Sequence, residues 1–229
     1  MREEATPIEE KVKGRKIGLF GGTFNPIHLG HLRGAEEIRE AFDLQEVIFI
    51  PAAIPPHKAM GKMIEASHRL EMVKGAVLSN PAFSVSDVEL RRSGKSYSID
   101  TIQYFKEHYE GPLFFIMGRD AFKEIETWKA FQDLFSLCNF IIMTRPGSSE
   151  TVHPSKLPEK IRSAFAFDEG VKDWVHVSGH TLHFKKITFL DISSTKIREL
   201  IERGESVRYL IPAEVETYVR QHGLYREKR

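Results

Sequence analysis

Two histidines and a pair of glycines lie close together near the start of the chain, in a pattern suited to phosphate chemistry. Gly21 and Gly22 follow a short apolar run, and His28 and His31 lie at the start of a helical pattern. A strand, a glycine turn and a helix in this order present backbone N–H groups and a helix N-terminus to a phosphate. Both imidazoles can face one side of the first helical turn, and Gly30 between them allows a nucleotide to approach closely. The pattern predicts phosphoryl or nucleotidyl transfer.

Each part of this motif also has a simpler interpretation. A glycine pair after a strand is common, and alone it predicts phosphate binding weakly. His28 and His31 could be zinc ligands or structural residues, but no nearby cysteine or third ligand has a suitable spacing. We therefore predict no protein-held metal, and we treat the two histidines as donors to a phosphate.

Two further groups of residues follow predicted strands, where ligands bind in parallel sheets. His57 and Lys58 come after the run 47–51 and offer cationic donors for a phosphate, although in isolation they would read as a solvated surface turn. Gly118 and Asp120 follow the run 113–117, where a glycine permits close approach and a carboxylate can accept hydrogen bonds from ribose hydroxyls.

Trp128 can stack on a flat heteroaromatic ring, although a tryptophan near a helix start often belongs to the core. Near the end of the chain, Ser194 and Thr195 begin a helical pattern, and Arg198 follows one turn along. The hydroxyl groups can simply cap the helix. The same groups, with free N–H donors and the positive end of the helix dipole, can also bind a polyphosphate.

Short apolar runs alternate with amphipathic patterns, which predicts an α/β fold with a mainly parallel sheet and helices on both faces. Residues 1–14 read as a mobile leader before a single domain at 15–229, which ends in a small helical part at about 194–224. The stretch 146–172 is irregular and reads as a loop or insertion. The predicted strands are 16–20, 47–51, 83–88, 113–117, 140–144, 175–177 and 187–190, and the predicted helices are 30–42, 67–79, 99–109 and 128–137.

The composition is that of a soluble globular protein. The chain has 229 residues, with 41% hydrophobic and 28% charged residues and a formal net charge of +1. This balance gives no reason to expect nucleic acid or an anionic membrane as a partner. The single cysteine excludes an internal disulfide, and the sequence has neither a signal peptide nor an apolar run long enough for a membrane span. We expect a cytoplasmic protein with small-molecule substrates.

The motifs together resemble the bacterial nicotinate-nucleotide adenylyltransferases of the nucleotidyltransferase superfamily. The likeness covers about residues 15–225, nearly the whole chain. The matching pieces are Gly-Gly-Thr-Phe-Asn-Pro-Ile-His-Leu-Gly-His at 21–31, Pro-Pro-His-Lys at 55–58, Ser-Tyr-Ser-Ile-Asp-Thr at 96–101, Gly-x-Asp at 118–120, Trp128, Arg-Pro-Gly at 145–147 and Ile-Ser-Ser-Thr-x-Ile-Arg at 192–198.

This resemblance implies a Rossmann-like nucleotidyltransferase fold and the reaction of nicotinate mononucleotide with ATP to give deamido-NAD and pyrophosphate, with Mg²⁺ carried by the nucleotide. The implied catalytic residues are His28 and His31. The implied ATP-binding residues are Gly21, Gly22, Thr23, Phe24, Gly118, Ser194, Thr195 and Arg198. The implied mononucleotide-binding residues are Asn25, His57, Lys58, Ser98, Asp120 and Trp128.

Two residues depart from the family pattern: Arg119 within Gly-x-Asp, where many relatives have a small residue, and Lys129, where an aromatic residue is sometimes found. Other acceptors fit the same fold, among them nicotinamide mononucleotide, phosphopantetheine or a CTP-dependent alcohol phosphate. A non-catalytic nucleotide-binding protein and a relation to class I aminoacyl-tRNA synthetases are further alternatives. The choice between acid and amide, and homo-oligomer formation, stay open.

Overall fold

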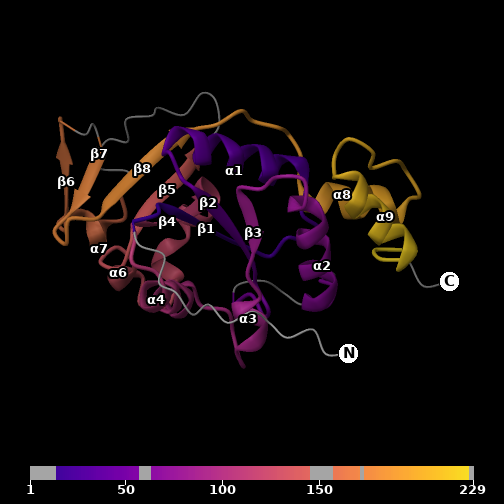
Figure 1. Ribbon diagram of the computed structural model, residues 1–229, viewed down its shortest axis with the longest axis horizontal. Coiled ribbons are helices and arrows are strands. Elements are labelled where there is room, and N and C mark those ends of the chain that lie inside the picture. The colour runs from indigo at the N-terminus through magenta and orange to yellow at the C-terminus, as the bar shows by residue number, and fades with distance from the viewer. Residues whose placement is uncertain (1–13, 57–62, 145–156, 171–172, 227–229) are drawn as a thin grey trace.

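The computed structural model describes residues 14–56, 63–144, 157–170 and 173–226, and Figure 1 shows how their elements are arranged. The strands are β1 (Ile17–Gly22), β2 (Glu46–Pro51), β3 (Phe83–Val85), β4 (Leu113–Gly118), β5 (Asn139–Thr144), β6 (Phe165–Asp168), β7 (Asp173–His176) and β8 (Thr181–Lys186). The helices are α1 (Leu29–Ala41), α2 (Ala66–Val77), α3 (Val88–Arg91), α4 (Ser98–His108), α5 (Arg119–Lys123), α6 (Phe131–Leu134), α7 (Glu159–Arg162), α8 (Ser194–Glu202) and α9 (Ala213–Gln221), with a 3₁₀ turn η1 (Ile125–Thr127).

The strands form one sheet in the order β3-β2-β1-β4-β5-β8-β7-β6. All pairs from β3 to β8 are parallel, whereas β7 pairs antiparallel with both β8 and β6. The chain order reverses at β1, which lies between β2 and β4. In open sheets of this kind, ligands bind beyond the carboxyl ends of the strands at such a reversal. The predicted Rossmann-like, mainly parallel fold is confirmed, with an antiparallel edge added.

The central strands are apolar on both faces, as expected for a sheet that helices cover on both sides. Ile17 and Leu19 belong to one core cluster and Phe20 belongs to the other, because side chains alternate along a strand. Helices α4, α5, α6 and α7 contribute buried residues to the first cluster, and α1, α2, α8 and α9 contribute to the second. Each face of the sheet therefore has its own core.

The C-terminal helices α8 and α9 lie at the end of the molecule remote from β6 and β7 (Figure 1). Their buried residues Ile197 and Val215 join the same core as α1 and α2. Pro212 is the N-cap of α9, and Gly223, just past the end of the helix, has a φ of 59°. A proline at the start and a glycine just past the end are typical of a helix, and α8 and α9 confirm the predicted C-terminal helical part.

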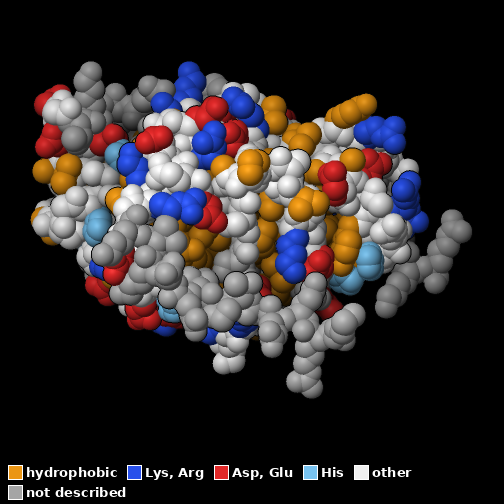
Figure 2. Space-filling model, in the orientation of Figure 1, with side chains coloured by type: hydrophobic (Ala, Val, Ile, Leu, Met, Phe, Trp, Pro, Cys, Tyr) orange, Lys and Arg blue, Asp and Glu red, His pale blue; other side chains and the backbone are white. Residues whose placement is uncertain are grey.

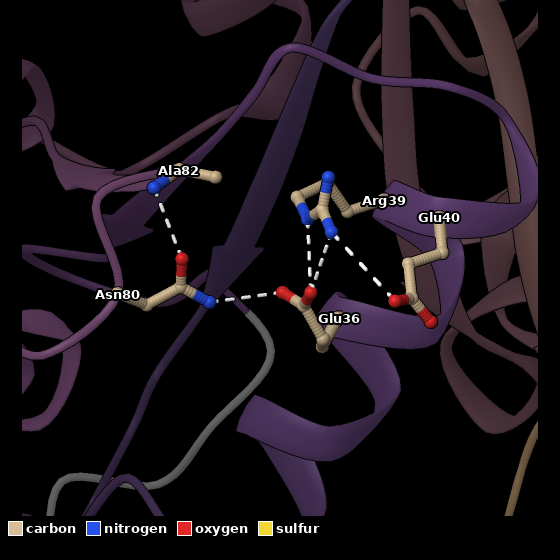
Figure 3. A network of polar contacts seen from close by, with 5 residues as sticks. All are labelled: Glu36, Arg39, Glu40, Asn80 and Ala82. Carbon is tan, nitrogen blue, oxygen red and sulfur yellow. Dashed lines mark hydrogen bonds and ion pairs between the residues drawn. The ribbon is translucent and has the colours of Figure 1, made fainter.

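A polar network fixes the outer side of α1 (Figure 3). One Glu36 carboxylate oxygen accepts from Arg39 at 2.7 Å, and the other accepts from the Asn80 side-chain amide at 2.9 Å. The Asn80 side-chain oxygen in turn accepts from the Ala82 N–H at 3.0 Å, just before β3. The Arg39 hydrogen bond holds the pKa of Glu36 below its ordinary value. The network ties α1 to the connection that leads into β3.

The surface mixes charges of both signs. Figure 2 shows Lys and Arg side chains interspersed with Asp and Glu over the face that it draws, with no large field of one sign. This agrees with the net charge of +1. Within the described residues, no helix has the length and apolar character needed to cross a membrane.

Two predicted elements are wrong. The run 187–190 is not a strand: the strand is β8, and after it Thr188 donates its N–H to the Glu37 side chain at 2.8 Å instead of to the sheet. The predicted helix at 128–137 is reduced to the four residues of α6. Ala130 has a φ of 49°, a left-handed conformation that interrupts a continuous helix between η1 and α6.

Several predicted boundaries also shift. The strand predicted at 83–88 ends at Val85, and the one predicted at 175–177 is β7. The stretch 146–172 is not irregular throughout, because its described part contains α7 and β6. Residues 1–13, 145–156 and 171–172 lie outside the described residues, as do almost all of the predicted leader and the Arg-Pro-Gly motif.

Candidate active site

The turn between β1 and α1 is shaped by a close contact between Gly22 and Phe24. Phe24 has a φ of 46°, and its ring lies so near that a Cβ added to Gly22 would be 2.7 Å from a ring atom. A side chain at this position would therefore displace the ring. The glycine lets the backbone of the turn stay open at the carboxyl end of β1.

His28 and His31 both lie at the N-terminus of α1 and face each other. Their rings are stacked, with 3.6 Å between centroids and 26° between planes. The His28 N–H donates to Nδ1 of His31 at 3.2 Å, so Nδ1 is unprotonated and a neutral His31 carries its proton on Nε2. Gly30 allows this stack, because a Cβ there would be 3.1 Å from the His28 ring. The predicted shared face of the two imidazoles is confirmed.

Burial sets the charge of His28. The residue is only 7% exposed, and desolvation lowers its pKa from 6.5 to about 4. At neutral pH the His28 ring is therefore uncharged.

The pKa of His28 predicts a loss of stability in acid. Between pH 6.5 and pH 4 the unfolded chain binds a proton at this site and the folded chain does not. The free energy of unfolding should therefore fall as the pH drops, by about 2 kcal/mol at pH 5 from this group alone. Urea titrations at about pH 7.5 and pH 5 should show a correspondingly smaller loss for His28→Asn than for the unchanged protein. Equal losses in the two proteins would contradict the assignment.

The N-terminus of α8 is docked against the same turn. The Ser194 hydroxyl donates to the Pro26 carbonyl at 2.8 Å, and Arg198 donates to the Asn25 carbonyl at 2.8 Å. Arg198 also donates to the Thr195 hydroxyl oxygen at 3.2 Å. Two helix N-termini thus meet at one place, although they lie more than 160 residues apart in sequence. One carries the two histidines, and the other carries the Ser-Thr pair.

Tyr225, which sequence reasoning did not select, completes this junction. Its hydroxyl donates to Oδ1 of Asn25 at 2.8 Å, and burial raises the pKa of Tyr225, which keeps the hydroxyl protonated as a donor. Asn25 is therefore held by Arg198 at its carbonyl and by Tyr225 at its side chain. The sequence offers no local signal for a contact that spans 200 residues.

A cavity of about 250 Å³ lies beyond the ends of β1 and β4, and Thr23, two residues before Asn25, is part of its wall. Gly21, Gly22 and Thr23 line it from one strand, and Gly118 lines it from the other. A Cβ at Gly118 would meet no atom within 4 Å, so the position opens toward free space. The predicted gathering of motifs at the carboxyl edge of the sheet is confirmed for these residues.

Trp128 and Ser98 line the far side of the cavity. Trp128 is half-buried, and its ring meets the edge of Phe115 at 6.3 Å between centroids and 89° between planes. This contact fixes the indole and leaves it on the cavity wall, where it is available for stacking. Ser98 begins α4.

Three residues predicted to bind the mononucleotide are placed neither in the cavity wall nor at the junction of α1 and α8. The Asp120 side chain is 76% exposed, lies 3.3 Å from Lys123 and does not line the described wall, so its role at a ribose stays a prediction. His57 and Lys58 lie outside the described residues, although Pro55 and Pro56 just before them line the cavity.

Sequence reasoning missed Arg69, a fully buried residue of α2 that braces the site. Its guanidinium donates to the carbonyls of Thr23 at 2.8 Å, Ala53 at 3.0 Å and Ile64 at 3.2 Å. It thus links the turn after β1 to the loop after β2. A signal exists in the sequence, because Arg69 falls on the same helical stripe as the buried Met72 and Val73.

A second brace holds the loop after β2 from the other side. The Ser96 hydroxyl oxygen accepts from the N–H groups of Ala53 at 2.9 Å and Ile54 at 3.3 Å. Glu89, buried beside it, accepts from the Thr101 hydroxyl at 2.7 Å, and burial raises the pKa of Glu89. Both polar side chains line the cavity, so the wall and the loop are built together.

The site and its sheet define a class of protein. Residues 19–200 match the family model described as cytidylyltransferase-like, a range that includes most of β1, the histidine turn and the start of α8. The chain is thus a nucleotidyltransferase of the cytidylyltransferase-like family.

Curated relatives narrow this class. A protein of Syntrophotalea carbinolica called a probable nicotinate-nucleotide adenylyltransferase is 46% identical over 214 residues, which cover 93% of this chain and 98% of that one. A Geobacter sulfurreducens protein of the same name is 44% identical over 211 residues, with 92% and 98% covered. The chain belongs to the nicotinate-nucleotide adenylyltransferases.

Solved structures agree on the fold. The nicotinic acid mononucleotide adenylyltransferase of Plasmodium falciparum, complexed with NaAD, superposes with a TM-score of 0.68 at 19% identity, over 92% of this chain and 97% of that one. A putative nicotinate-nucleotide adenylyltransferase of Vibrio parahaemolyticus gives 0.59 at 18% identity, with 93% and 97% covered.

Proposed function

We propose that this chain transfers the adenylyl group of ATP to nicotinate mononucleotide and releases deamido-NAD and pyrophosphate. The observation that carries the proposal is the junction of the α1 and α8 N-termini beside a cavity walled by Trp128. Two helix N-termini that meet at one place can bind a polyphosphate. A cavity with an aromatic side chain in its wall can bind a flat ring. The relatives are named as probable nicotinate-nucleotide adenylyltransferases, which favours the acid form of the mononucleotide as the acceptor.

The reaction needs positioning more than proton transfer. A phosphate oxygen of the mononucleotide forms a bond to the α-phosphorus of ATP, while the bond from that phosphorus to the oxygen bridging it to the β-phosphate breaks. The mononucleotide phosphate is already an anion at neutral pH, so no strong base is required. Catalysis then consists of alignment and of stabilising charge on the phosphate oxygens.

The residues of the junction contact different phosphates of ATP. His31, with its proton on Nε2, and the uncharged His28 donate hydrogen bonds near the reacting phosphorus. Ser194, Thr195 and Arg198 hold the outer phosphates. The mononucleotide occupies the cavity with its phosphate toward Asn25 and the loop after β2, and the ribose and adenine edge of ATP lies against Gly118.

Magnesium would travel with the triphosphate. Within the described ranges, no three or more His, Cys, Asp or Glu side chains gather into a group that could hold a metal ion. Nucleotide phosphates commonly supply the ligands of Mg²⁺, with few or no protein side chains. We therefore assign no residue to it.

Pyrophosphate release tests the proposed function directly. The purified chain is mixed with ATP and Mg²⁺, and nicotinate mononucleotide, nicotinamide mononucleotide and phosphopantetheine are compared as acceptors. We expect turnover with the acid well above turnover with the other two. Turnover with phosphopantetheine alone, or binding of ATP without any turnover, would overturn the proposal.

Replacement of Trp128 should act on one substrate. Trp128→Ala removes the stacking surface and should raise KM for the mononucleotide about tenfold, with KM for ATP nearly unchanged, because base stacking on an aromatic side chain contributes about 1–3 kcal/mol. Trp128→Phe keeps a ring and should recover part of the loss. Steady-state kinetics with each substrate varied in turn decides this, and a rise confined to the KM for ATP would refute the stacking role.

A further inference from the structure

Lys129 is the only cation among the described residues that line the cavity. It follows Trp128 directly, and the reaction described above gives it no part. Its Nζ lies 2.9 Å and 3.2 Å from the two carboxylate oxygens of Asp100 and 4.8 Å from the centroid of the Tyr97 ring. The side chain is 50% exposed, so the ammonium is on the solvent-facing part of the wall.

These contacts hold the ammonium in place without using all of its N–H donors. Asp100 lies in the first turn of α4 and accepts from Nζ, and the face of Tyr97 attracts the cation from another side. A lysine ammonium has three N–H donors, and the two Asp100 oxygens occupy at most two of them. One donor therefore remains for a ligand, on a group that is already held in place before the ligand binds.

The other charged side chains of the cavity wall are acidic, so Lys129 decides how well the wall binds an acidic ligand. Glu89 and Glu124 are the other charged side chains among the described residues that line the cavity, so Lys129 is the only one of these three that would attract a ligand carboxylate. A ring stacked on Trp128 would carry its substituent within the same wall segment as the ammonium. A carboxylate and a carboxamide differ there by one charge, and only the carboxylate gains a charge-assisted hydrogen bond.

We propose that Lys129 is a specificity-determining residue that binds the ring carboxylate of nicotinate mononucleotide and so favours the acid over the amide. This inference rests on the proposed function and goes beyond it, because the bound acid would be recognised by a side chain in which this sequence departs from the family pattern. In this complex the Lys129 ammonium keeps its hydrogen bonds to Asp100 and donates its remaining N–H to the substrate carboxylate.

The test compares the two mononucleotides in one assay. The ratio of kcat/KM for the acid to kcat/KM for the amide isolates the ring substituent, because both substrates carry the same phosphate and ribose. Lys129→Met should lower this ratio about tenfold, a modest effect because the ammonium is half-exposed and screened. Lys129→Arg keeps the charge and should keep the ratio within about threefold.

A matched control is available on α2. Lys74 is 53% exposed and lies 2.9 Å from the Glu71 carboxylate, which is nearly the setting of Lys129, but it does not line the cavity. Lys74→Met should leave the ratio unchanged. In addition, raising the salt concentration should lower the ratio of the unchanged protein and leave that of Lys129→Met flat.

The outcomes separate the inference from the proposed function. A protein that turns over neither mononucleotide would refute the function itself. A protein that prefers the acid, together with a Lys129→Met variant that keeps the full preference, would leave the function standing and overturn the inference. Equal losses for acid and amide in Lys129→Met would mean a structural role, and that too would overturn it.

Discussion

His31→Ala should lower kcat by about 10²–10³, the range for removing one donor that acts in the transition state. The structure gives the reason. The His28 N–H occupies Nδ1 of His31, so the remaining ring proton is on Nε2, and the ring is held by edge contact with Phe24 at 5.2 Å between centroids. The donor is thus oriented before substrate binds. Single-turnover kinetics at saturating substrates measures the effect on the chemical step.

His31 also caps the helix, so catalysis and capping must be separated. His31→Gln offers a side-chain oxygen at the same helical position, which can accept from the backbone N–H of His28 as in a capping box. We expect this variant to keep the thermal midpoint near that of the unchanged protein and still to lose about 10² or more in kcat. A His31→Gln variant with normal kcat would show that capping is the whole role of this residue. The exposed His222, replaced by alanine, provides the neutral control.

Arg198→Met should lower kcat/KM for ATP by about 10² or more. Arg198 donates to the Asn25 carbonyl and to the Thr195 hydroxyl, so it both joins α8 to the turn after β1 and supplies positive charge for the outer phosphates. Its removal leaves the Asn25 carbonyl with one donor fewer and removes a clamp on the leaving pyrophosphate. The loss should fall mainly on ATP, with binding of the mononucleotide altered less.

Arg203, at the other end of α8, provides the comparison. Its side chain is 56% exposed and pairs with Glu205 on the surface. Arg203→Met should leave both kinetic constants within about twofold, since exposed ion pairs contribute little. If both arginine variants lose activity alike, the effect comes from destabilising α8, and the phosphate role of Arg198 would be wrong.

The features that could be predicted from the sequence are those with a local signal. The glycine turn and the paired histidines share one strand–turn–helix segment, and their geometry follows from its spacing. The start of α8 was readable from Ser194 and Thr195 as a cap or an anion site, and docking against Pro26 brings it to the site. The partnership itself depends on a contact across 168 residues, which the pattern of a single segment does not contain.

The features that could not be predicted depend on tertiary structure. Alanine is a good helix former, yet Ala130 is left-handed, and the helix α6 begins only after it. The β-branched and apolar residues at 187–190 resemble a strand, but the sheet ends at Lys186. The helical stripe that Arg69 shares with Met72 and Val73 signals its burial, but only the tertiary structure shows that its guanidinium joins two loops of the site.

Identification of the product shows whether the adenylyl group of ATP reaches nicotinate mononucleotide. The purified chain is incubated with ATP, Mg²⁺ and nicotinate mononucleotide, and dinucleotide and pyrophosphate are quantified together by mass spectrometry and an enzymatic assay. We expect deamido-NAD and pyrophosphate in equal amounts, with both formed about 10²-fold or more slowly in His31→Gln. Pyrophosphate without the dinucleotide, or ADP as the second product, would mean that the α-phosphorus is not transferred to this acceptor and would contradict the account.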